Sequence, residues 1–78
     1  MISKKASFGE RAKIGENSVI RDNVILSDDV IIFPNVYIGE STRIGEGSII
    51  QYGSFIEHDC NIGRHCRIGI MRVRNLVG

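Results

Sequence analysis

The sequence predicts an all-β fold, a parallel β-helix, and the first observation behind this prediction is a strict six-residue spacing. A large apolar side chain opens every hexad without a register slip. Six is a multiple of the two-residue period of a strand and does not fit the 3.6-residue period of a helix. A fixed hexapeptide period is typical of a β-helical solenoid. The positions are Ile2, Phe8, Ile14, Ile20, Leu26, Ile32, Ile38, Ile44, Ile50, Ile56, Ile62 and Ile68.

Small side chains at a second position are the next observation. The fifth residue of each hexad is Ala, Ser, Val, Thr or Cys, and it lies two residues before the next large apolar residue. Residues two apart in a strand point to the same side, so both series are predicted to face the interior. The small series is Ala6, Ala12, Ser18, Val24, Val30, Val36, Thr42, Ser48, Ser54, Cys60 and Cys66.

Turn residues are the third observation. Asn or Gly stands at the fourth position of several hexads, and both tolerate the positive φ that sharp turns require. Three hexads then form one triangular coil, so residues 18 apart stack and the chain makes about four coils. No segment shows a helical pattern. The turn residues are Asn17, Asn23, Asn35, Gly47 and Gly53.

Stacking at 18 residues predicts which side chains share an outer face. Two faces are apolar, and apolar columns on so small a domain predict a partner surface, with a homotrimer as the expected assembly. Ordinary surface apolarity is the other interpretation. The first apolar column is Val19, Tyr37 and Phe55, followed by Val73 if the repeat continues; the second is Ile31 and Ile49 beside Phe33; the face predicted to be solvated is Ser7, Ile25, Arg43 and Asn61.

The repeat fails after Ile68. Continued in register, it would place Arg72 in the small inward position and Arg74 where Ile is due. An Arg buried in an apolar core is very costly. The sequence therefore predicts a β-helix over residues 1–69, and an irregular tail or a truncated continuation over residues 70–78. Either the tail caps the solenoid or the chain is the N-terminal part of a longer protein, and we favour the second interpretation.

Composition excludes several classes of function. The net charge of +1 gives no argument for a nucleic-acid partner. No apolar run is long enough to span a bilayer, and no secretory signal pattern is present, so we expect a cytoplasmic protein. The two cysteines are then expected to be reduced.

Two histidines are the main candidates for chemistry, His58 and His65. His58 falls in the turn after the Phe55 strand, beside the proposed interface. Imidazole titrates near neutral pH and suits a general base, and the adjacent Asp59 could orient it. A turn histidine without a chemical role is the alternative. Two histidines seven residues apart, with no third, argue against a zinc site of three histidines, and no metal is expected. The acidic turn column Glu10, Asp28 and Glu46 could hold a cation, although such a column more often marks a solvated corner.

Residues 2–69 resemble the bacterial hexapeptide-repeat acyltransferases, which form left-handed β-helices. The run Ser54-Phe55-Ile56-Glu57-His58-Asp59-Cys60-Asn61-Ile62-Gly63 is similar to the sugar O- and N-acetyltransferases of the sialic-acid and bacillosamine pathways. This resemblance implies acetyl-CoA as co-substrate and a sugar amine or hydroxyl as acceptor. It also implies that His58 is the general base and that Asp59 increases its basicity.

The same resemblance suggests residues for acetyl-CoA. These enzymes carry a second His nine residues after the first, where this chain has Arg67. Arg67, with His65 and Arg64, is therefore the candidate set for the CoA phosphates. Two further interpretations stay open. One is a non-catalytic β-helical trimerisation or scaffold module, and the other is an inactive truncated product.

Overall fold

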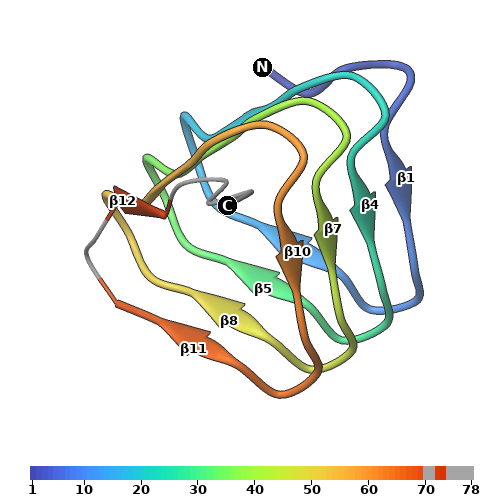
Figure 1. The fold of residues 1–78 in the computed structure, drawn as a ribbon, viewed down its shortest axis with the longest axis vertical. Helices are drawn as coiled ribbons and strands as arrows, with labels where there is room; N and C mark the ends of the chain where they lie inside the picture. Colours follow the sequence, from blue (N-terminus) through green and yellow to red (C-terminus); the bar gives the residue numbers. More distant parts are fainter. Residues whose placement is uncertain (70–71, 74–78) are drawn as a thin grey trace.

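A computed structural model describes residues 1–69 and the strand at residues 72–73. Within them the chain forms twelve two-residue strands joined by turns, and none of these residues is helical (Figure 1). No helix among them is long and apolar enough to cross a membrane. The strands are β1 Ser7–Phe8, β2 Lys13–Ile14, β3 Val19–Ile20, β4 Ile25–Leu26, β5 Ile31–Ile32, β6 Tyr37–Ile38, β7 Arg43–Ile44, β8 Ile49–Ile50, β9 Phe55–Ile56, β10 Asn61–Ile62, β11 Arg67–Ile68 and β12 Arg72–Val73.

Three parallel sheets of four strands wrap around one core. Their strand orders are β1-β4-β7-β10, β2-β5-β8-β11 and β3-β6-β9-β12. In Figure 1 the strands β1, β4, β7 and β10 of the first sheet lie side by side, and β5, β8 and β11 of the second sheet form the neighbouring face. Neighbouring strands from β1 to β11 are 18 residues apart, as in the pairing of Tyr37 with Phe55. The predicted parallel β-helix is therefore confirmed and agrees with the left-handed class, with slightly fewer complete turns than the four expected.

The two inward series make the core. From Ser18 to Ile62 every member of both series is buried, while Ile2 and Phe8, below which no coil lies, are 47% and 43% exposed. Each buried hydroxyl in this core donates a hydrogen bond to a backbone carbonyl of the next coil, so no buried side-chain oxygen or nitrogen among the described residues lacks a partner. These hydroxyls belong to Ser18, Thr42, Ser48 and Ser54.

The turns adopt the left-handed conformation at the fourth position of every complete hexad from Phe8 to Ile62. The five positions predicted from Asn and Gly are confirmed. Five others carry residues that adopt positive φ less readily, and Asp59 (φ 57°) and His65 (φ 54°) are among them. The stacked coil imposes this conformation, because tertiary contacts outweigh the cost of a positive φ at a non-Gly residue. The other three are Arg11, Asp29 and Ser41.

The last strand departs from the 18-residue spacing. In β12, Arg72 pairs with Phe55 and Val73 with Ile56. The placements of Val73 after Phe55 and of Arg72 in the small inward position are expected only if the repeat continues in register, and β12 does not keep that register. A one-residue shift exchanges the two sides of a strand, and here it gives Val73 the register position that Arg74 would otherwise occupy. The predicted boundary after Gly69 stays a prediction, and residues 70–71 and 74–78 lie outside the described part.

The outer columns follow the predicted register, but their exposure is uneven. Phe55 is 38% exposed, whereas Val19 and Tyr37 are half-buried. In the second column Ile31 and Ile49 are also half-buried, and Phe33 packs against the core. Ile25, on the face predicted to be solvated, is 40% exposed. An interface on the two apolar faces stays a prediction.

Candidate functional site

The His58–Asp59 pair occupies the turn between β9 and β10. Both side chains are mostly exposed, at 66% and 58%, and His58 Nδ1 lies 2.7 Å from Asp59 Oδ2. An ionised carboxylate only accepts hydrogen bonds, so the imidazole donates through Nδ1–H. This contact fixes the tautomer and leaves Nε2 as the acceptor nitrogen. His58 and Asp59, the two residues that the sequence suggests for catalysis, therefore face one another.

The surrounding charges make this imidazole more basic. The pKa of His58 is raised above 6.5, chiefly by the hydrogen bond to Asp59 and further by the negative charges of Asp59, Glu57 and Glu40. Partial desolvation opposes this change. Hydrogen bonds and opposite charges stabilise the protonated imidazole. A general base becomes protonated during the reaction, so these contacts favour that role.

A groove of about 370 Å³ opens beside His58. One wall is aromatic, because the rings of Tyr37 and Phe55 stack with their centroids 4.7 Å apart and their planes at 8°. Arg21 forms an ion pair of 3.9 Å with Glu40 in the same groove. An apolar wall beside charged groups and a base can hold a small polar molecule with an apolar side. The lining residues are Arg21, Tyr37, Gly39, Glu40, Phe55, Glu57 and His58.

Sequence reasoning missed Arg21, Gly39 and Glu40 as groove residues. The 18-residue spacing contains the signal, since Arg21 and Gly39 share a column with Glu57, and Glu40 stacks below His58. Residues in one column of a solenoid are close neighbours although they are far apart along the chain. The 18-residue spacing therefore also predicts which turn residues stack on the outer surface, just as it predicts the apolar columns of the faces.

Gly39 lies directly beneath the His58 turn. It is buried, and a Cβ added there would stand 2.7 Å from His58 N and 2.8 Å from the carbonyl carbon of Glu57. Both are backbone atoms of the next coil, so they cannot yield as the end of a flexible side chain can. The close approach of the two coils at this corner therefore requires glycine.

Replacing Gly39 with Ala is expected to lower the free energy of unfolding by roughly 1–3 kcal/mol, the usual cost of overpacking. The added methyl forces the backbone of the His58 turn away from its position. Gly63→Ala is the matched control, because the nearest atom to its added Cβ, Cys66 Sγ, lies at an ordinary 3.7 Å. Urea unfolding of both variants measures the difference, and equal stabilities would contradict the proposed close packing.

The three residues predicted for the CoA phosphates lie away from this groove. Arg64 and His65 form the next turn, between β10 and β11, and Arg67 is on β11. All three are exposed, and none lines the groove. The structure therefore gathers them near another corner of the triangle and does not bring them to His58. Their role stays a prediction.

The two cysteines are free, and Cys60 follows the catalytic candidates directly. Cys60 is 7% exposed, as the predicted inward position requires. Burial raises the pKa of its thiol, with smaller contributions from the charges of Glu57 and Asp59. A protonated thiol is a weak nucleophile, so this residue does not suit covalent catalysis.

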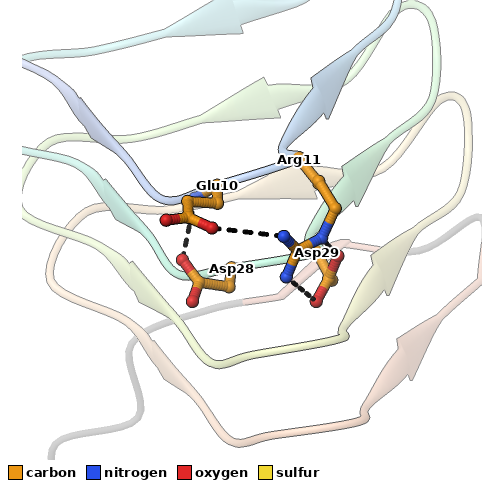
Figure 2. A network of polar contacts seen from close by, with 4 residues as sticks. All are labelled: Glu10, Arg11, Asp28 and Asp29. Atoms are coloured by element: carbon orange, nitrogen blue, oxygen red, sulfur yellow. Dashed lines mark hydrogen bonds and ion pairs between the residues drawn. The ribbon is translucent and has the colours of Figure 1, made fainter.

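Two members of the acidic turn column, Glu10 and Asp28, belong to a network of polar contacts around Arg11 (Figure 2). Glu10 N donates to Asp28 Oδ1 at 2.8 Å, and Arg11 donates to both carboxylate oxygens of Asp29 at 2.6 and 3.1 Å. The guanidinium lowers the pKa of Asp29 through this hydrogen bond. Arg11 thus supplies the positive charge at this corner. Across residues 1–69 no group of three or more His, Cys, Asp or Glu side chains has the arrangement of a metal site.

Comparison with known proteins supports the repeat. Residues 23–58 match the family described as bacterial transferase hexapeptide (six repeats). The acetyltransferase domain of PglB from Neisseria gonorrhoeae FA1090 in complex with acetyl coenzyme A is similar at 24% identity and a TM-score of 0.46, over 95% of this chain and 50% of that one. A second structure of the acetyltransferase domain of PglB from Neisseria gonorrhoeae FA1090 is similar at 24% identity and a TM-score of 0.40, over 96% of this chain and 54% of that one. This chain thus spans about half the length of both. A comparison with curated proteins finds no match.

Proposed function

Because residues 23–58 carry the hexapeptide repeat of bacterial transferases, we propose that this chain is an acetyl-CoA-dependent acetyltransferase or part of one. Its acceptor is the amine or hydroxyl of a sugar. The observation that carries the proposal is the His58–Asp59 pair, whose free Nε2 stands beside a groove with an aromatic wall. The resemblance of the run around His58 to sugar acetyltransferases supplies the acceptor class and the acyl donor.

The proposed chemistry is a direct transfer assisted by a general base. His58 Nε2 takes the proton of the acceptor while the acceptor nitrogen or oxygen bonds to the thioester carbonyl carbon. The carbon–sulfur bond then breaks, and the proton held on His58 is available to the departing thiolate. Asp59 keeps Nδ1–H oriented and stabilises the imidazolium, as the third member of a nucleophile–base–carboxylate arrangement does.

A homotrimer is part of this proposal, because the candidate residues for the two substrates lie apart within one subunit. Tyr37 and Phe55 line the groove and also belong to the proposed interface, so a neighbouring subunit would stand beside His58. The corner of that subunit would then carry the arginines for CoA. The cytoplasm is the proposed location, since both acetyl-CoA and reduced thiols are found there.

Light scattering of the purified 78-residue chain tests the assembly. We expect a trimer whose mass is independent of concentration, because the apolar columns need cover. Phe55→Glu is expected to reduce that mass to the monomer, since it puts a charge into the interface. The matched control is Asn61→Glu, which adds the same charge on the third face, where β10 exposes Asn61. A wild-type monomer, or a trimer unchanged by Phe55→Glu, would exclude these faces as the interface.

The pH dependence of acetyl transfer tests the role of the pair. The assay follows release of the CoA thiol with a panel of nucleotide-linked sugars that carry a free amine or only hydroxyls. A general base acts in its neutral form, so the rate rises with pH through the pKa of His58, which lies above 6.5. Asp59→Asn removes the main cause of that elevation and is expected to move the midpoint to lower pH while reducing the maximal rate.

Two results would count against the proposal. A midpoint that does not move in Asp59→Asn would show that another group is the base. Absence of thiol release with every sugar, from a folded trimer, would favour the trimerisation or scaffold module. The failure of the predicted CoA residues to share a groove with His58 within one subunit is the observation that keeps this second candidate in view.

A further inference from the structure

The hydroxyl of Thr42 lies one coil beneath the His58–Asp59 turn and contacts both of its ends. Thr42 Oγ1 donates to Glu57 O at 3.0 Å, on the residue before the turn. The same oxygen accepts from Cys60 N at 3.4 Å, on the residue after it. Thr42 itself is fully buried. One buried side-chain oxygen therefore bridges the two backbone groups that flank the catalytic candidates.

The fold does not require a hydroxyl at this position. Val24 occupies the same column one coil below Thr42, is equally buried and offers no such bond to the turn above it. Ser18 makes the same pair of bonds around another turn, to Phe33 O at 2.8 Å and from Val36 N at 3.1 Å. The bridge is thus an addition that some corners have and others lack. The corner of His58 has it.

We propose that Thr42 is a positioning residue for the His58–Asp59 pair. Its hydroxyl holds the two ends of the turn, so that the imidazole and the carboxylate stay within hydrogen-bond distance. The positioning of His58 is a property of the protein without substrates. Only the catalytic value of that positioning rests on the proposed function.

The turn has a backbone conformation that contacts with the coil below must support. Asp59 adopts φ 57°, which costs a non-Gly residue conformational energy unless the surroundings hold it. One further bond, from Asp59 N to Glu40 O at 2.8 Å, anchors the middle of the turn. Removing the Thr42 hydroxyl removes both the bond that it donates to Glu57 O and the bond that it accepts from Cys60 N. The two ends of the turn then lose this link to the coil below.

The titration of His58 reports this positioning directly. Its imidazole faces the carboxylates of Asp59 and Glu57 on its own coil, and Glu40 on the coil below, where Arg21 pairs with Glu40. Of these contacts the hydrogen bond to Asp59 contributes most to the elevated pKa. A turn that relaxes lengthens that bond first, and the pKa of His58 then falls toward its ordinary value.

The experiment is an NMR titration of the imidazole protons in the whole 78-residue chain, with His58→Gln used to assign the signal. Thr42→Val keeps the shape of the side chain and removes only the hydroxyl. We expect it to lower the titration midpoint of His58, whereas Thr42→Ser keeps the wild-type midpoint. Ser18→Ala removes an equivalent bridge at a distant turn and is expected to leave the midpoint unchanged.

A wild-type midpoint in Thr42→Val would overturn the proposal, and so would an equal shift in Ser18→Ala. If Thr42→Val does not fold, as judged by circular dichroism, Thr42→Ala is titrated in its place with the same two outcomes. The readout needs neither acetyl-CoA nor an acceptor. A shifted midpoint in a chain that transfers no acetyl group would therefore refute the proposed function and leave the positioning role intact.

Discussion

Replacing His58 with Gln is expected to lower the rate of acetyl transfer by about 10²–10⁴-fold, the usual contribution of a general base. Gln has a similar reach but cannot take up a proton at neutral pH. The fold should survive, because the side chain is 66% exposed and takes no part in the core. Thiol release under saturating acetyl-CoA and acceptor measures the effect on kcat, while circular dichroism reports the fold.

Lys13→Gln is the control for this variant. Lys13 is exposed on β2, outside the groove, so its loss should leave the rate unchanged. A His58→Gln chain that transfers acetyl groups at the wild-type rate would remove His58 from the mechanism. A chain that loses its fold together with its activity would instead assign the residue a structural role.

Replacing Ile38 with Ala is expected to cost roughly 2–5 kcal/mol of unfolding free energy, as for other large-to-small core substitutions. Ile38 is fully buried between Ile20 and Ile56 in its column. The coils cannot close the cavity, because backbone bonds on both sides fix their spacing, such as Gly39 N to Ile56 O at 2.8 Å. A small domain has only about 5–15 kcal/mol in total, so this loss is a large fraction.

The comparison for Ile38→Ala is Ile25→Ala. Ile25 is the same residue type on β4 but points outward and is 40% exposed, so its truncation should change stability by less than about 1 kcal/mol. Urea unfolding at one fixed protein concentration measures both, since assembly makes apparent stability depend on concentration. Equal costs for the two variants would contradict the assignment of inward and outward positions.

The contact between His58 and Asp59 could be predicted from the sequence, whereas most of the groove around them could not. His58 and Asp59 are neighbours in the chain, so their contact needed only the correct turn. Arg21 and Glu40 lie 37 and 18 residues before His58, and only the stacking of coils brings them to the same edge. Arg67, which the spacing of related enzymes suggests for acetyl-CoA, lies outside this groove together with Arg64 and His65, and the role of all three stays a prediction.

The sequence by itself determined the all-β solenoid, the inward series and the five Asn and Gly turn positions. It could do so because a six-residue period that repeats without interruption repeats the same local geometry in every hexad. The tertiary structure alone decided three further matters: the positive φ of Asp59, the one-residue shift of β12, and the bridge from Thr42 to Glu57 and Cys60. Each depends on contacts between coils, where residues about 15 to 18 positions apart meet and override what the local residue types prefer.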